Sequence, residues 1–123
     1  MYWIFVETEF EASHQLTFAD GTQESLHLHP WRVTAAVCAE TVNREGLVMD
    51  FHLLEEIMFT AIEPLRGKQL EKTPLFSTRN ASAENLAKCL FDAASPRIPP
   101  PACLGFVEVT EAAGCRARYQ AGG

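Results

Sequence analysis

The stretch that decides the fold is the first segment of the chain, residues 2–14, which read YWIFVETEFEASH. Mostly apolar side chains occupy the even positions up to His14, and glutamates occupy positions 7, 9 and 11. Residues two apart point to the same face of a strand, so this period of two predicts a half-exposed β-strand with one acidic face. His14 would stand at its far end, in phase with the apolar side chains.

A second strand is predicted over residues 26–39, which read LHLHPWRVTAAVCA. His27 and His29 share a face with the apolar positions that follow them. Pro30 interrupts this pattern because it cannot donate a hydrogen bond to a neighbouring strand. We therefore expect an edge position or a bulge close to the two histidines.

The rest of the chain predicts two helices and then two more strands. Asp50 is a good N-cap for a helix that ends near Pro64. The other elements are a helix from residues 80–82 to about 94, a stiff proline-rich connector at 96–101, and strands at 104–111 and 115–120. The order β-β-α-α-β-β indicates an α+β fold with an antiparallel sheet.

Composition limits the function classes. The 123 residues suggest one domain, residues 1–123, and a net charge of −6 without a basic run argues against nucleic-acid binding. The apolar stretches fall short of the roughly 20 residues that a membrane helix needs. The start of the chain lacks a signal-peptide pattern, so we expect a cytoplasmic protein that does not bind membranes. Its four cysteines form no C-x-x-C pair and are expected to be free thiols.

Three histidines suggest a metal site. His27 and His29 stand two apart on one strand, with Cα atoms roughly 6.5–7 Å apart, so both imidazoles reach one ion. His14, from the neighbouring strand, would complete a set of three nitrogen ligands with a fourth position open, as in catalytic zinc sites. The alternative is that the H-x-H pair consists of two ordinary histidines, because sequence spacing alone does not place His14 beside them.

Taken together, these residues resemble a known family, the 6-pyruvoyl-tetrahydropterin synthases and the related bacterial 6-carboxy-tetrahydropterin synthases of queuosine biosynthesis. The resemblance covers nearly the whole chain. Five motifs carry it: F-x-A-x-H at 10–14, H-G-H at 27–29 with Leu28 in place of glycine, G-x-x-x-D-F at 46–51, T/S-x-E-N-L-A at 82–87, and a glutamate eight residues before an aromatic, Glu111 and Tyr119.

The resemblance implies a tunnelling fold, in which two helices cover one face of a four-stranded antiparallel sheet. It also implies a homo-oligomer, a trimeric ring or a hexamer, with active sites between subunits. It implies zinc on His14, His27 and His29, and a pterin substrate whose amino group and ring N–H donate hydrogen bonds to Glu111. The reaction would be that of a zinc-dependent lyase acting on 7,8-dihydroneopterin triphosphate or a close relative.

The family's acid–base residues are not matched. Its cysteine, aspartate and histidine correspond here to Gln23, Arg66 and Gly67, which cannot do that chemistry. Some relatives that cleave dihydroneopterin to 6-hydroxymethyl-dihydropterin lack the cysteine and use a glutamate beside its position. Glu24 fits that pattern and is the candidate base, although it also reads as a charged residue leaving a turn. The remaining alternatives are a non-catalytic pterin-binding ring protein and a zinc enzyme with another substrate.

Overall fold

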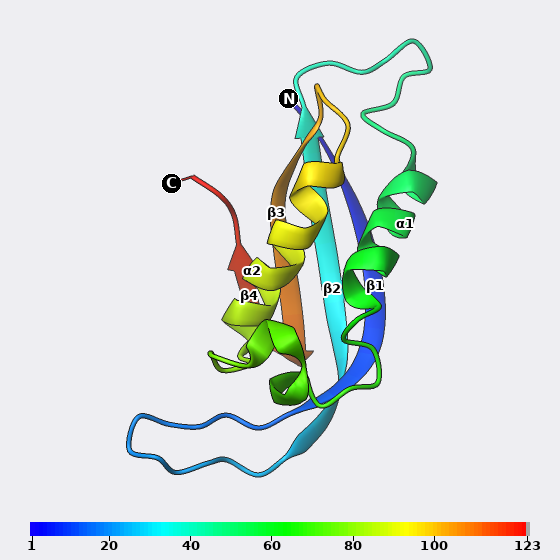
Figure 1. Cartoon of the computed structure of the whole chain (residues 1–123). Coiled ribbons are helices and arrows are strands. Elements are labelled where there is room, and N and C mark those ends of the chain that lie inside the picture. The colour runs from blue at the N-terminus through cyan, green and yellow to red at the C-terminus, as the bar shows by residue number, and fades with distance from the viewer. Residues whose placement is uncertain (123) are drawn as a thin grey trace.

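A four-stranded antiparallel sheet is covered on one face by two helices (Figure 1). The computed structural model describes residues 1–122. The strands are β1 (Tyr2–His14), β2 (His27–Ala39), β3 (Cys103–Ala112) and β4 (Cys115–Tyr119), and they lie side by side in chain order. The helices α1 (Phe51–Ile62) and α2 (Ala83–Ala94) fall between β2 and β3 in the sequence. This confirms the predicted element order and the tunnelling-fold arrangement.

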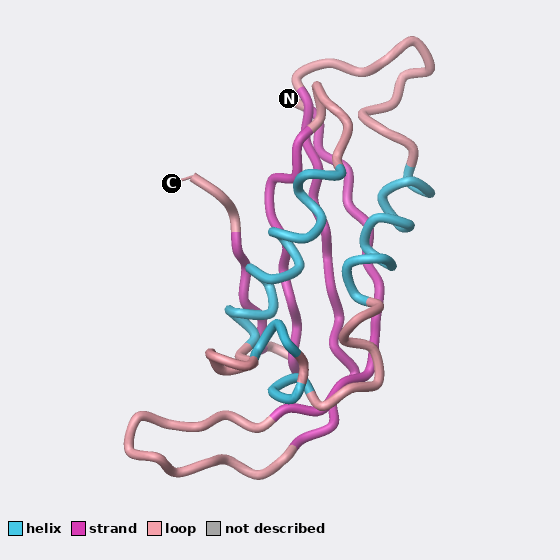
Figure 2. The backbone as a smooth tube through the Cα atoms, viewed as in Figure 1, coloured by secondary structure: helices cyan, strands magenta, loops and turns pink. Residues whose placement is uncertain are grey.

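The first two strands form a long hairpin with continuous pairing from Tyr2 opposite Ala39 to His14 opposite His27. Its connecting loop, residues 15–26, projects beyond the sheet at the end opposite the N-terminus (Figure 2). Gly21 takes a left-handed conformation with φ of 87° at the tip of this loop, which glycine adopts without strain. The hairpin therefore brings the first and second histidine motifs together by register alone.

Both helices begin at side-chain caps. The Asp50 carboxylate accepts a hydrogen bond from the backbone N–H of His52, and the Ser82 hydroxyl accepts one from Asn85. Each helix buries its apolar face against the sheet, where the core-facing residues of β2 include Trp31 and Val33, both with no exposed surface. Because the helices cover only one face of the sheet, apolar and polar side chains alternate along β1 and β2.

The opposite face of the sheet is open and carries a group of aromatic side chains. Trp3, Phe5 and Phe106 lie with ring centroids 6.0–6.5 Å apart. Trp3 and Phe5 are 44% and 51% exposed. Gly105 leaves room for Trp3, because a Cβ atom at that position would overlap the tryptophan ring.

Three local features refine the sequence prediction. The irregular region before α2 contains two short 3₁₀ turns, Leu70–Lys72 and Pro74–Phe76. The proline-rich connector also begins in a 3₁₀ turn, Ser95–Arg97, because proline is tolerated in the first turn of a helix. Pro30 lies in β2 beyond the last residue paired with β3, so β2 has only β1 as a neighbour there. This agrees with the expected edge position.

No helix among residues 1–122 is long and apolar enough to cross a membrane. The four cysteines are free thiols, as predicted: Cys38 and Cys89 are buried, whereas Cys103 and Cys115 are exposed.

Candidate metal and pterin site

His14 is the buried centre of the site. It ends β1, is 1% exposed, and lies edge-on to the ring of Trp31 with centroids 4.9 Å apart. Its Nδ1 atom lies 2.7 Å from the carbonyl oxygen of Ala81, just before the N-cap of α2. A carbonyl oxygen only accepts hydrogen bonds, so Nδ1 carries the proton and Nε2 of the neutral ring has a free lone pair.

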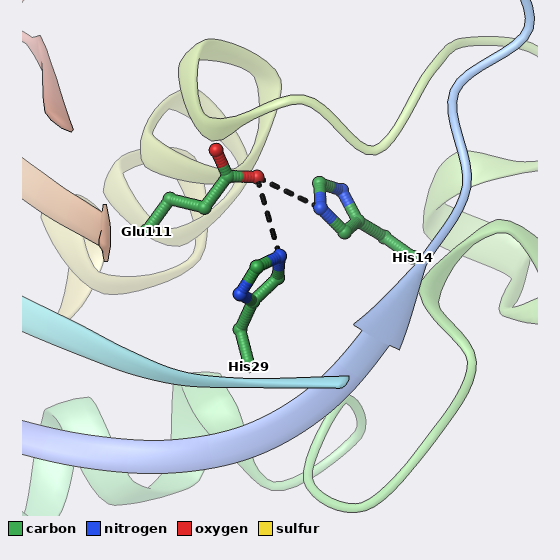
Figure 3. Close-up of side chains that lie close together, drawn as sticks. All are labelled: His14, His29 and Glu111. Atoms are coloured by element: carbon green, nitrogen blue, oxygen red, sulfur yellow. Dashed lines mark ion pairs between the residues drawn. The ribbon is translucent and has the colours of Figure 1, made fainter. Parts of the chain in front are cut away.

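That Nε2 atom faces a carboxylate and a second imidazole (Figure 3). It lies 2.8 Å from Oε1 of Glu111, at the end of β3, and the same oxygen lies 3.8 Å from Nε2 of His29. Despite the short distance, His14 Nε2 has no hydrogen-bond partner of acceptable geometry, and it is the one such buried side-chain atom among residues 1–122. Direct contact with Glu111 therefore leaves this nitrogen unsatisfied.

A metal ion would satisfy it. The ligand atoms of His14, His29 and Glu111 all lie within 4.8 Å of one another. Ligand atoms around a tetrahedral zinc ion are roughly 3.3 Å apart, and the observed separations from Oε1 of Glu111 fall on either side of that value. The bond from His14 Nδ1 to Ala81 is the outer contact that usually fixes a ligating imidazole. Two imidazoles and a carboxylate thus form a donor set that fits zinc.

His27 lies next to this group without joining it. It is the register partner of His14, and its ring stacks on that of His29 with centroids 5.5 Å apart. Its centroid is 6.3 Å from that of His14, and the residue is exposed. The structure therefore brings together all three predicted ligands, but it places the Glu111 carboxylate, not His27, among the converging donor atoms.

His29 has the electrostatics of a neutral ligand. Its side chain is 22% exposed. Burial lowers its pKa below the usual value, and the Glu111 carboxylate opposes this shift. The result favours the uncharged imidazole, which is the form that binds metals.

Glu24 lies in the projecting loop, where it accepts hydrogen bonds from other residues of the loop. Its carboxylate Oε1 accepts a hydrogen bond from the backbone N–H of Leu16 at 3.1 Å, and its backbone carbonyl accepts one from the side chain of Gln15. The residue is half-buried, and its charge opposes the lowering of the His29 pKa less than that of Glu111 does. Glu24 is thus held against Gln15 and Leu16 and lies outside the converging donor atoms.

The three positions that correspond to the family's acid–base residues carry no replacement for them. Gln23 is exposed and donates a hydrogen bond to the hydroxyl of Thr17. Arg66 pairs with Glu63 on the surface. Gly67 has φ of 70° and donates its backbone N–H to the carbonyl of Glu11, so its role here is conformational.

Glu111 also borders a surface pocket of about 440 Å³ between the start of α2 and the β3–β4 hairpin. This volume lies within the range of small-molecule sites. The pocket is lined by Ala83, Glu84, Glu111, Cys115, Arg116, Ala117 and Arg118. A larger pocket of about 460 Å³ includes Gln15 and Gln23 but none of the three histidines. Of these two pockets, the first shares the Glu111 side chain with the metal group. A smaller pocket of about 220 Å³ on the other side of the β3 end also borders Glu111.

Sequence reasoning missed two parts of this site. It assigned Glu111 to the substrate and did not foresee its approach to His14. It also missed Ala81, whose contribution is a backbone carbonyl and leaves no mark in the side-chain sequence. The sequence offered one indication of this role. Ala81 directly precedes the capping residue Ser82, so its carbonyl lies outside the helix and can accept a hydrogen bond from another segment.

The comparisons with known proteins agree on the family. The family model described as 6-pyruvoyl tetrahydropterin synthase matches residues 3–122. The 6-carboxy-5,6,7,8-tetrahydropterin synthase of Synechocystis is 30% identical over 97% of this chain and 93% of its own length.

Solved structures show the same fold. The 6-pyruvoyl tetrahydropterin synthase of Caenorhabditis elegans superposes with a TM-score of 0.83 at 20% identity, covering 99% of this chain and 98% of its own. That of Plasmodium vivax gives 0.77 at 16% identity, covering 96% of each chain. With the family model matched over nearly the full length, this chain belongs to the 6-pyruvoyl tetrahydropterin synthase family.

Proposed function

We propose that this chain is a zinc-dependent pterin enzyme, a lyase that acts on 7,8-dihydroneopterin triphosphate or a close relative. The observation that carries the proposal is His14, a buried imidazole whose Nδ1 is fixed on Ala81 while its unsatisfied Nε2 faces His29 and Glu111. The names of its relatives, 6-pyruvoyl and 6-carboxy tetrahydropterin synthases, point to the same substrate class.

The proposed ligands of zinc are His14, His27 and His29, and Glu111 is the proposed anchor of the pterin ring. Zinc held there would supply Lewis acidity toward the oxygens of the substrate side chain. The Glu111 carboxylate offers only acceptors, which suits the amino group and ring N–H of a pterin. The pocket beside Glu111 supports this placement.

The proposed base is Glu24. The Plasmodium vivax relative has been solved with a catalytic glutamate replaced by alanine and by cysteine, so a glutamate serves as a catalytic residue elsewhere in this family. A carboxylate three residues before the proposed ligand His27 is suited to accept a proton from the substrate side chain. Cleavage of dihydroneopterin to 6-hydroxymethyl-dihydropterin is the variant of the reaction that this choice of base favours.

A second candidate function is pterin binding without turnover, by a ring-forming protein. Gly67 favours it, because a residue without a side chain stands where the family has a histidine, and its backbone is committed to Glu11. The ring would be a cytoplasmic homo-oligomer, a trimer or a hexamer. The outer edges of β1 and β4 support assembly, because edge strands present unpaired backbone groups to another chain. Light scattering on the purified protein measures the subunit number.

A product assay separates the two functions. Zinc-loaded protein is incubated with dihydroneopterin triphosphate or with dihydroneopterin, and pterin products are separated by chromatography. The enzyme proposal expects a 6-substituted pterin product that a Glu24→Gln variant fails to form. Glu45→Gln, at an exposed loop carboxylate, is the matched control and keeps activity. Tight pterin binding with no product from either substrate would favour the binding protein.

Measurement of bound zinc distinguishes two possible ligand sets, which are His14, His27 and His29 or His14, His29 and Glu111. His14→Ala and His27→Ala are expected to lose bound zinc, whereas Glu111→Gln keeps zinc and loses pterin affinity. His52→Ala is the control, because this fourth histidine is 90% exposed on α1. If His27→Ala kept full zinc content while Glu111→Gln lost it, the ligands would be His14, His29 and Glu111, and the proposed pterin anchor would be wrong.

A further inference from the structure

Two cysteines lie together on the open face of the sheet, far from the histidines. Cys38 in β2 and Cys103 in β3 are register partners, directly opposite one another. Their Sγ atoms are 3.7 Å apart, although the residues are 65 apart in the sequence. The pairing of the strands, and not local sequence, creates this thiol pair.

The backbone geometry suits a covalent bond between them. Directly opposed residues of antiparallel strands have Cα atoms roughly 4.5–5.5 Å apart. Disulfides span Cα separations of about 4.4–6.8 Å, so the sulfur atoms can come into bonding distance by side-chain rotation without movement of the strands. Neither thiol takes part in the metal site described above.

The two thiols differ in their access to solvent. Cys103 is exposed, whereas Cys38 is 8% exposed between its partners Trp3 on one side and Cys103 on the other. Burial raises the pKa of the Cys38 thiol, and the neighbouring Cys103 adds to that shift. An oxidant in solution therefore meets Cys103 first, and Cys38 is the second thiol within reach of it.

We propose that Cys38 and Cys103 are a site of reversible disulfide formation in this protein, with a peroxide as the oxidant. The Cys103 thiolate attacks the peroxide O–O bond and becomes a sulfenic acid, and hydrogen peroxide is reduced to water. The Cys38 sulfur then attacks the Cys103 sulfur, the S–S bond forms, and the sulfenic oxygen leaves as a second water. The two thiols lose two electrons and two protons in total, and a dithiol reductant reverses the step.

The bond would join β2 to β3 and close a loop that contains both helices. A cross-link over this many residues removes much of the freedom of the unfolded chain, so the oxidised protein resists unfolding more than the reduced one. The expected effect is a rise of several degrees in melting temperature on oxidation, reversed by dithiothreitol. This consequence does not depend on the proposed enzyme activity.

The other two cysteines serve as internal controls. Cys89 is buried in α2, and Cys115 is exposed at the start of β4 opposite Ala112. Cys115 matches Cys103 in exposure but has no cysteine as its register partner. It should therefore remain a free thiol under conditions that join Cys38 to Cys103.

The test is mass mapping of the full chain after treatment with hydrogen peroxide, removal of the peroxide with catalase, and alkylation of the remaining thiols in denaturant. We expect a cross-linked Cys38–Cys103 peptide, lighter by two hydrogen atoms, with Cys89 and Cys115 alkylated. Cys103→Ser should abolish the cross-link and the rise in melting temperature, whereas Cys115→Ser should keep both.

Other results would overturn the proposal. One is Cys103 oxidised to the sulfinic acid while Cys38 is still alkylated. Another is a disulfide that includes Cys115 or joins two chains through Cys103. Circular dichroism of each variant before oxidation checks that the sheet has formed, and oxidation with diamide gives a second measurement of whether the two sulfur atoms can bond.

Discussion

Replacement of Trp31 by phenylalanine tests whether the site depends on the core beneath it. Trp31 has no exposed surface, and its ring lies edge-on to His14 and His29, with centroids 4.9 and 5.4 Å away. Its indole Nε1–H donates a hydrogen bond to the backbone carbonyl of Ala12 at 3.1 Å. Phenylalanine keeps an aromatic ring at this position but removes the donor and part of the volume.

The expected cost follows from these two losses. A buried hydrogen bond of this kind contributes about 1 kcal/mol to the free energy of unfolding. The indole is about 40 Å³ larger than a phenyl ring, and at about 24 cal/mol per Å³ the resulting cavity adds about 1 kcal/mol. Trp31→Phe should therefore lower the free energy of unfolding by about 2 kcal/mol. It should also weaken metal binding, because the rings of His14 and His29 lose part of their support.

Urea denaturation followed by far-ultraviolet circular dichroism measures the stability, since tryptophan fluorescence changes with the substitution itself. Trp3→Phe is the matched control, because Trp3 is the other tryptophan of the chain and lies 44% exposed on the open face of the sheet. It should cost well under half as much. Equal losses in the two variants would refute the argument, because they would show that burial and the bond to Ala12 do not distinguish the two sites.

Three further predictions follow from single contacts. Gly105→Ala should displace the Trp3 ring and shift the tryptophan emission to longer wavelength, because the added Cβ overlaps that ring; an unchanged spectrum would contradict this. Ser82→Ala should lower the free energy of unfolding by about 1 kcal/mol through loss of the α2 cap, measured by urea denaturation. Burial raises the pKa of Cys89, so little of this thiol is ionised at pH 7. Its reaction with a disulfide reagent should therefore be slower than that of exposed Cys115, and its rate should increase only as the pH rises toward the raised pKa.

The strands and helices were predictable because local patterns determine them. The period of two in residues 2–14, the cap at Asp50 and the start of the second helix near residues 80–82 are properties of short segments, and all three appear in the structure. The 3₁₀ turn at Ser95–Arg97 was missed because proline suits a first helical turn as well as an extended connector.

The site was only partly predictable because it depends on contacts between distant segments. The proximity of the three histidines was predictable, since His27 and His29 lie on one strand and His14 is the register partner of His27. The approach of Glu111 to His14 depends on how β3 lies against the hairpin, over a separation that no local pattern encodes. The hydrogen bond from the Leu16 N–H to the Glu24 carboxylate likewise depends on the conformation of the loop. The three-residue spacing between Glu24 and His27 does not reveal that conformation.

The bond between His14 and Ala81 joins two residues 67 apart and ties the end of β1 to the segment that leads into α2. An ion that holds the imidazole would therefore restrain the first turn of that helix, although no residue of the helix touches the ion. Amide hydrogen exchange offers a readout of this connection: protons at Ala83, Glu84 and Asn85 should exchange more slowly when zinc is added, while those at the start of α1 keep their rates. The exchange rates at the start of α2 would then report whether the metal site is occupied.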